Sequence, residues 1–186
     1  MPRKRSGSSA SHVKFTYFFA SSLDGFIADG HGGVEWLDVF RTPDRFGEFN
    51  EFMSSMDGAV LGRKTYEKAL AMVKGGKWPM PKIPCVVLSK TRTTGPHVEF
   101  WSKPLGDLPE YFRKKGSQNV WMMGGGEAAA SFLSAGLLTD IRQSLMPILL
   151  GAGIPAYGAM QNQVALKLVE CKHYPNGAIS MHYRSS

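Results

Sequence analysis

An apolar run followed by three glycines constrains the fold of this 186-residue chain more than any other segment. Residues 120–123 are bulky and apolar, as in a strand that is covered on both faces. Residues 124–126 are all glycine, and an alanine-rich helical pattern begins at residue 128. Glycine lets backbone N–H groups approach a ligand, and a helix N-terminus favours phosphate. The segment therefore predicts either a phosphate cradle or a tight strand-to-helix turn that binds nothing.

Strands and helices alternate through the first three quarters of the chain. Strand patterns occupy residues 13–19, 59–61 and 85–88, and helical patterns occupy residues 43–56, 66–74 and 107–115. Such alternation predicts an α/β fold with a mostly parallel sheet and helices on both faces. Asn176 and Gly177 separate two alternating runs, which predicts a C-terminal antiparallel hairpin.

The composition narrows the class of protein. The length suits one domain, which we expect at residues 13–186 after a disordered basic arm at residues 1–12. With no run of 18 apolar residues and no secretory signal, we expect a cytoplasmic protein without a membrane span. The net charge of +7 favours an anionic ligand, but no dense basic stripe supports nucleic-acid binding. Cys85 and Cys171 lie in apolar segments and predict buried free thiols, and metal-ligand spacing is absent from the sequence.

Three predicted strand ends carry glycine, hydroxyl or basic residues. They are residues 62–65, 89–92 and 124–127. In the first, Gly62 exposes backbone N–H groups, Arg63 can form a forked contact, and Thr65 adds a donor. The alternative for this cluster is an ordinary solvated first turn. Because ligands of parallel sheets bind beyond the carboxyl ends of the strands, we expect all three clusters to converge on one nucleotide cofactor.

The segment around Trp36 is a candidate lid. Glycines at positions 30, 32 and 33 loosen the chain after the first strand, which predicts a flexible loop with an exposed tryptophan. The alternative is a surface loop with Trp36 packed inward.

A helix follows that loop, with Thr42 as its N-cap and Pro43 at its first position. Its apolar residues recur at helical spacing and predict the face that packs inward: Phe46, Phe49, Met53 and Met56. Asn50 lies near that face, whereas Glu48 and Glu51 fall on the opposite side.

Five motifs, in order, resemble those of the dihydrofolate reductase family. Three of them are residues 60–67, 87–89 and 123–127. Residues 22–28 and 139–155 are more similar to one branch, which holds the reductase domain of bacterial riboflavin biosynthesis and stand-alone relatives. The resemblance covers roughly Val13 to Tyr183. It implies a three-layer α/β fold of about eight strands and four helices, with NADPH as the hydride donor.

The resemblance also implies which residues contact the cofactor. Ala20 and Ile27 would border the nicotinamide, and Trp36 would match the lid tryptophan of the family. The phosphates, the ribose and the adenine end would be held by Gly62, Arg63, Lys64, Thr65, Leu88, Ser89, Lys90, Gly124, Gly125, Gly126 and Glu127. Since Arg63 and Lys90 would meet the 2′-phosphate, we expect NADPH to bind more tightly than NADH.

One departure from the family concerns the substrate. Dihydrofolate reductases hold the pterin with a carboxylate near the start of a helix, and Phe46 stands at that position here. We therefore expect hydride transfer to a C=N or C=O bond of another small heterocycle, contacted by Trp36, Phe46 and Asn50. The alternatives are the riboflavin-pathway substrate 5-amino-6-(5-phosphoribosylamino)uracil and a nucleotide-binding module without catalysis. A nucleic-acid-binding protein is a third hypothesis, supported by charge alone.

Two expectations concern catalysis and assembly. Asp24 is the candidate proton donor in its motif, and the alternatives are water as the donor and a plain turn role for Asp24. The apolar block of Ile148, Leu149, Leu150 and Ile154 predicts a homodimer built through the C-terminal antiparallel strands, as the resemblance also implies. The alternative is that this block covers the core of its own chain.

Overall fold

The computed structural model describes residues 12–72, 78, 80, 82–91 and 93–185. The strands are β1 (Lys14–Ser22), β2 (Phe26–Ala28), β3 (Gly58–Gly62), β4 (Cys85–Leu88), β5 (Glu99–Trp101), β6 (Asn119–Gly124), β7 (Leu138–Met146), β8 (Ile154–Pro155), β9 (Leu166–His173) and β10 (Ile179–Ser185). The helices are η1 (Glu35–Phe40), α1 (Pro43–Ser55), α2 (Arg63–Met72), η2 (Leu105–Asp107), α3 (Leu108–Lys114) and α4 (Gly126–Ser134), where η marks a 3-10 helix. The expected arm lies outside the described residues except for His12, and so does Arg92 of the second cluster.

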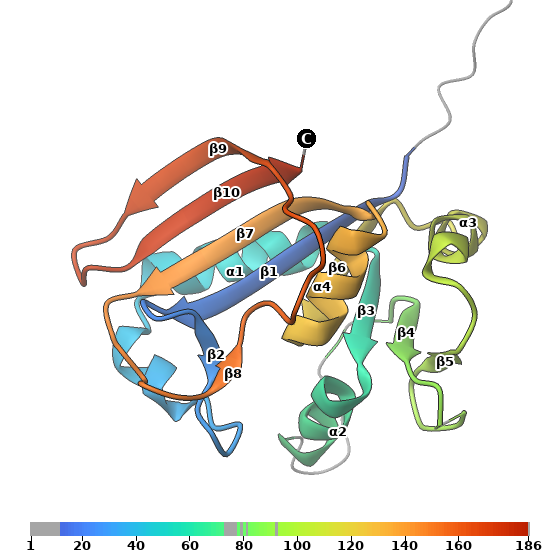
Figure 1. The fold of residues 1–186 in the computed structure, drawn as a ribbon, viewed down its shortest axis with the longest axis horizontal. Helices are drawn as coiled ribbons and strands as arrows, with labels where there is room; N and C mark the ends of the chain where they lie inside the picture. The colour runs from blue at the N-terminus through green and yellow to red at the C-terminus, as the bar shows by residue number, and fades with distance from the viewer. Residues whose placement is uncertain (1–11, 73–77, 79, 81, 92, 186) are drawn as a thin grey trace, which may run out of the picture.

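Eight strands form one sheet in the order β5-β4-β3-β6-β1-β7-β10-β9, and β2 pairs with β8 beside it (Figure 1). Every pairing from β5 to β7 is parallel, whereas β10 runs antiparallel to both β7 and β9. Gly177, with φ of +82°, lies in the turn between β9 and β10. The mostly parallel sheet and the C-terminal hairpin are therefore confirmed.

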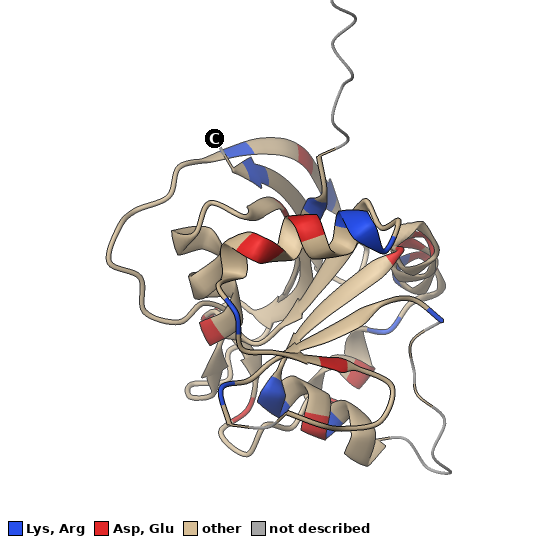
Figure 2. Ribbon diagram, turned by 90° about the vertical axis from the view of Figure 1, so that its right-hand side faces the viewer, with Lys and Arg blue, Asp and Glu red and all other residues tan. Residues whose placement is uncertain are grey.

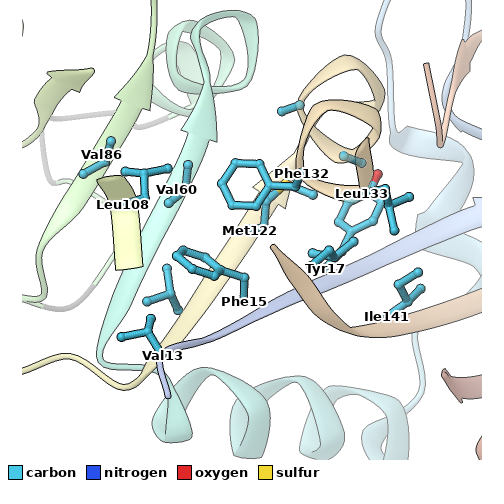
Figure 3. Packing of buried hydrophobic residues seen from close by; sticks show 14 of the residues in the cluster. Val13, Phe15, Tyr17, Val60, Val86, Leu108, Met122, Phe132, Leu133 and Ile141 are labelled. Atoms are coloured by element: carbon cyan, nitrogen blue, oxygen red, sulfur yellow. The ribbon is translucent and has the colours of Figure 1, made fainter. Parts of the chain in front are cut away.

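Helices α3 and α4 cover one face of the sheet. Phe112 of α3 and Phe132 of α4 pack edge-on against Phe15 of β1, at ring-centroid distances of 5.9 and 5.3 Å. Figure 3 shows Phe15 and Phe132 in this cluster, with Val60 and Met122 from neighbouring strands. Full burial of one such side chain contributes roughly 1.5–3 kcal/mol, so this cluster is a main source of stability.

Helices α1 and α2 cover the other face. Phe52 of α1 stacks on Phe18 of β1 at 4.5 Å, and Tyr66 of α2 is fully buried in the same cluster. Figure 1 shows α1 behind the sheet and α4 in front of it. The two covered faces give the three-layer arrangement that the sequence predicts.

The outer strands of the sheet are covered less. All residues of β9 are exposed, including Cys171, so the expectation of a buried thiol is wrong there. Cys85 is buried at the start of β4, as expected. The difference follows from position, because β4 lies inside the sheet and β9 forms its edge. Pro147 follows the last residue of β7, where its missing N–H costs no ladder hydrogen bond.

Candidate functional site

The carboxyl ends of three neighbouring strands bring the glycine segments together. Gly62 at the end of β3 is paired with Leu88 at the end of β4, and Leu61 is paired with Gly124 at the end of β6. A methyl group on Gly62 would lie 3.3 Å from the carbonyl oxygen of Gly124 and 3.5 Å from the amide nitrogen of Gly125. Segments more than 60 residues apart in the sequence thus meet at one edge of the sheet.

Two helices begin at this edge. Helix α2 starts at Arg63, directly after β3, and α4 starts at Gly126 with Gly125 as its N-cap. Gly125 has no side chain that could cap the first turn, so the N–H groups of that turn are free to donate to a ligand. Together with the positive end of the helix dipole, they suit the oxygens of a phosphate group.

The backbone of Gly125 borders open space. Among the described residues beyond its chain neighbours, a Cβ there would meet Ile27 Cδ1 and Thr65 Oγ1, each at 3.9 Å. A ligand can therefore approach this peptide through the space that a side chain would fill. Gly125 has φ of −84°, which any residue can adopt, whereas the φ of Gly124 is +114°. Backbone conformation requires glycine at 124, and space for a ligand favours it at 125.

Gly126 is packed closely against a distant part of the chain, and Glu127 is exposed. A Cβ on Gly126 would overlap the carbonyl oxygen of Pro155, and the Gly126 carbonyl accepts a 2.9 Å hydrogen bond from the N–H of Gly158. Gly126 is thus a packing position between α4 and residues 155–158. The Glu127 side chain is exposed in the first turn of α4.

The predicted cations lie near this edge and are exposed. Arg63 Nη1 lies 3.0 Å from Glu67 Oε1, one turn further along α2, and both side chains are about 40% exposed. Such pairs contribute little to stability, so Arg63 can reorient toward an anion at small cost. Lys64 and Lys90 are exposed as well, and Ser89 accepts a 3.3 Å hydrogen bond at Oγ from the N–H of Thr91.

Lys68 is a further cation at this site that the sequence reasoning missed. A methyl group on Gly32 would lie 3.6 Å from Lys68 Nζ, so the loop after β2 approaches α2. In that loop, hydrogen bonds from the N–H groups of Gly33 and His31 lower the pKa of Asp29. Lys68 follows Lys64 by four residues, and this helical spacing was the signal that could have identified it.

Trp36 is packed inward instead of standing on an exposed lid. Trp36 is the second residue of η1. It is partly buried and packs in a cluster with Ala20, Met146 and Tyr174. Its indole Nε1 is buried and has no hydrogen-bond partner among the described residues. The expectation of an exposed tryptophan is therefore wrong, and the alternative of inward packing is confirmed. Ala20 and Trp36 both pack against this cluster.

Helix α1 starts at Pro43 as predicted, but it is rotated relative to the expected inward face. Phe49 and the buried Phe52 pack on the sheet, whereas Phe46 is 58% exposed and Asn50 is exposed. Phe46 and Asn50, the predicted substrate contacts, therefore lie on the exposed side of α1. The hydroxyl of Thr42 makes no capping hydrogen bond, although its backbone is extended as in an N-cap.

The acidic residues of α1, which is described throughout, do not point into the cluster around Ala20. Asp44 is exposed, and Glu48 and Glu51 line a cavity on the flank of α1 that faces β9. Both line this cavity beside Phe52, at the edge of the packed face. The helix therefore offers no inward carboxylate for a pterin.

Asp24 holds a loop together. Its carboxylate accepts hydrogen bonds from the Ser22 hydroxyl at 2.6 Å and from the N–H groups of Leu150 and Gly151 at 3.1 and 2.7 Å. These bonds, that from Ser22 above all, lower the pKa of Asp24. An ionised carboxylate that accepts three hydrogen bonds is a poor proton donor at neutral pH. The geometry favours the turn role for Asp24.

Other kinds of site receive no support within the described residues. They contain no group of three or more His, Cys, Asp or Glu side chains that could hold a metal ion. None of the helices there is long and apolar enough to cross a membrane. Figure 2 shows basic and acidic residues interspersed on one side of the molecule, without a continuous basic stripe.

Comparison with known proteins identifies the family. Residues 13–180 match the model of the RibD C-terminal domain. The chain is 29% identical over 174 residues to the uncharacterized protein YwjB of Bacillus subtilis strain 168, covering 91% of this chain and 97% of YwjB. A solved structure from Shewanella sp. PV-4, of a protein provisionally assigned to riboflavin biosynthesis, is 28% identical with a TM-score of 0.84, covering 94% of this chain and 99% of that one.

The fold is shared more widely. Dihydrofolate reductase from Enterococcus faecalis superimposes with a TM-score of 0.65 at 14% identity, covering 93% of this chain and 96% of that one. The resemblance drawn from five sequence motifs is confirmed in both family and fold. The chain belongs to the RibD C-terminal domain family, a reductase family with the dihydrofolate reductase-like fold.

Proposed function

We propose that this protein is an NADPH-dependent reductase that transfers a hydride to a C=N or C=O bond of a small heterocycle other than dihydrofolate. The observation that carries the proposal is the open backbone of Gly125, placed where the first turns of α2 and α4 converge. Family membership supports the choice of cofactor, because reductases of this family use NAD(P)H. The Enterococcus reductase with the same fold was solved with NADP(H).

The residues present fit a dinucleotide. The N–H groups at the start of α4 and the segment from Gly62 to Thr65 would hold the pyrophosphate, with Gly125 as the point of closest backbone approach. Leu88 and Ser89 would flank the adenine ribose. Arg63 and Lys90 would neutralise the 2′-phosphate, and the exposed Lys64 and the partly buried Lys68 add positive potential.

When bound, the cofactor supplies a hydride from its nicotinamide ring. The chain contributes position and exclusion of water, since Ala20 and Ile27 lie at the end of β1 and on β2, beside the glycine edge. Because Asp24 is held as an acceptor, we assign the proton to a water molecule. Asp24 acts by fixing the loop between β1 and β2.

The wall near Ala20 suits a flat ring. Trp36 and Phe40 are partly buried, pack against the buried Met146 and Tyr174, and offer aromatic surface. The buried Nε1 of Trp36 has no acceptor among the described residues, and a ligand carbonyl that reached it would recover the free energy lost by that burial. The missing α1 carboxylate argues against a pterin substrate.

Two experiments test the proposal. A fluorescence titration with NADPH, on wild type and on Gly125→Val, measures cofactor binding at the cradle. Turnover is then measured against dihydrofolate, 5-amino-6-(5-phosphoribosylamino)uracil and a set of quinones and aminopyrimidines. NADPH binding without turnover of any compound supports the non-catalytic module, and turnover of the aminouracil supports the riboflavin-pathway alternative. If wild type does not bind NADPH, both the reductase and the non-catalytic nucleotide-binding module are contradicted.

A further inference from the structure

A cavity of about 330 Å³ lies under the flank of α1 that faces the outer strands. It is bounded by α1 on one side and by β1, β7, β10 and β9 on the other. The described residues that line it include none of those assigned above to the cofactor. Its volume is in the range of small-metabolite sites.

The floor of this cavity is a row of side chains in register across four strands. Phe18 on β1 is paired with Arg142 on β7, Arg142 with His182 on β10, and His182 with Glu170 on β9. Residues paired in this way project to the same face of a sheet. Glu51 of α1 completes the lining from the opposite side.

The two faces of these strands differ in polarity. The face toward α1 carries Arg142, His182 and Glu170, whereas the other face carries Ile141, Tyr183 and Leu168, also paired in register. On that other face, Ile141 and Tyr183 pack into the hydrophobic core with Leu133 of α4. Toward α1, Arg142 and Glu170 are exposed to solvent, so a ligand that enters the cavity can contact their charges.

An ion pair and a hydrogen bond fix the walls of the cavity. Lys172 Nζ lies 2.8 Å from Glu48 Oε1 and ties β9 to α1, and His182 Nε2 lies 2.6 Å from Asp140 Oδ1. Partial burial opposes ionisation of Glu48, but Lys172 and Tyr174 outweigh it, so the pKa of Glu48 is lowered. These four side chains therefore already have partners within the chain.

Three charged side chains of the lining are left open. Arg142, Glu51 and Glu170 form no side-chain hydrogen bond or ion pair with another described residue. One guanidinium and two carboxylates therefore face the cavity. The partly buried ring of Phe18, stacked on the buried Phe52, forms an apolar wall beside them.

We propose that this cavity binds a free α-amino acid with an apolar side chain. The carboxylate of the ligand pairs with Arg142, whose planar fork suits two carboxylate oxygens. The ammonium group faces Glu51 and Glu170, and the side chain lies against Phe18 and Phe52. The site is distinct from the glycine edge, because none of the described residues that line it belongs to that edge.

The test compares one zwitterion with its two singly charged analogues. Isothermal titration of the full chain with L-phenylalanine, phenethylamine and 3-phenylpropionate measures what each charge of the ligand contributes to affinity. Titration with leucine and glycine measures what the side chain of the ligand contributes. We expect phenylalanine to bind at least about tenfold more tightly than either analogue, because each lacks one charge-assisted contact. We expect glycine to bind more weakly than leucine.

Two variants assign the charges to residues. Arg142→Gln should reduce phenylalanine affinity to that of phenethylamine and leave phenethylamine binding unchanged. Glu170→Gln should reduce phenylalanine affinity to that of 3-phenylpropionate and leave 3-phenylpropionate binding unchanged. Lys167→Gln is the matched control, since Lys167 is exposed on the same strand and does not line the cavity. NADPH affinity, measured in parallel, should be the same in all three variants.

Several outcomes would overturn the inference. No detectable binding of any of the five ligands at ~10 mM, tenfold above a millimolar dissociation constant, means that the cavity is a solvated crevice. Equal binding of the zwitterion and its analogues, or binding that Arg142→Gln and Glu170→Gln leave unchanged, places the ligand elsewhere.

Discussion

The carboxylate of Asp24 accepts a 2.7 Å hydrogen bond from the N–H of Gly151, which lies 127 residues further along the chain. This bond ties the loop after β1 to the loop between β7 and β8. Both loops border the edge of the sheet where the cofactor is expected. Their relative position therefore depends on a carboxylate that stays ionised.

The first prediction follows from this bond. Asp24→Asn should retain hydride transfer with an unchanged pH profile, because the carboxylate is not the acid, and should unfold at a lower temperature at pH 7. Since the folded-state pKa of Asp24 is lowered, its stabilisation is present above the unfolded pKa of about 3.9 and is lost as pH falls through the folded value. Thermal unfolding at pH 7 and near pH 2 checks this, with the exposed Asp44→Asn as control. A large loss of kcat with an unchanged melting temperature would restore Asp24 as the proton donor.

The second prediction concerns the cradle. Gly125→Val should fold and should lose NADPH binding, because its φ of −84° is open to valine and the side chain would occupy the approach to the backbone. Circular dichroism verifies the fold, and fluorescence titration measures binding. Gly106→Val is the control, as a Cβ there meets no described atom within 4 Å. Unchanged affinity in folded Gly125→Val would remove the cradle from the proposal.

The third prediction is a preference for NADPH over NADH of about tenfold or more, equivalent to ~1.4 kcal/mol. Arg63 and Lys90 are the cations expected to contact the 2′-phosphate, and charge-assisted contacts supply energies of this size. Lys90→Gln should shrink the preference without weakening NADH. Lys14→Gln, at the opposite end of its strand, should not. Equal affinities of wild type for NADPH and NADH at moderate salt would show that no cation contacts the 2′-phosphate.

The fourth prediction is weak or absent reduction of dihydrofolate. The acids of α1 lie away from the cluster around Ala20, so the protonatable edge of a pterin finds no carboxylate from that helix. A spectrophotometric assay with NADPH and dihydrofolate measures it. Turnover near ~10 per second, the median for enzymes, would mean that another group recognises the pterin.

The fifth prediction is a homodimer formed through the C-terminal strands. Leu149, Ile154, Leu166, Leu168 and Val169 are between 41% and 67% exposed, and a cavity with mostly apolar residues lies beside them around Tyr157 and Tyr183. Exposed apolar surface of this kind usually meets a partner. We expect sedimentation at micromolar concentration to give twice the 20.4 kDa of one chain, and Leu168→Lys to give the monomer. Wild type that sediments as a monomer would contradict the prediction.

The sequence predicted the sheet and the glycine edge because both depend on local patterns. Residues 120–127 show a strand, a turn and a helix within one short window, and the parallel arrangement then places Gly62, Leu88 and Gly124 at one edge. No knowledge of distant contacts is needed for that step.

The sequence could not predict features that depend on distant packing. Trp36 is covered by Tyr174 and Ala178, which lie more than 130 residues later. Helical spacing shows which residues of α1 share a stripe, but Phe46 and Phe52 are both compatible with a stripe through Phe49 and Met53, and the sheet selects Phe52. The role of Gly126 likewise depends on residues 155–158.

Three hydrogen bonds hold residues 155–158 against the rest of the molecule. The N–H of Ala156 donates to Gly25 at 2.9 Å, the Tyr17 hydroxyl donates to the carbonyl of Ala156 at 3.0 Å, and the N–H of Gly158 donates to Gly126 at 2.9 Å. The length of this stretch is thereby fixed, whereas residues 159–163 are exposed and irregular. A peptide tag inserted after Gln161 should be tolerated, while one residue added between Ala156 and Gly158 would pull the first turn of α4 out of register with the strand ends.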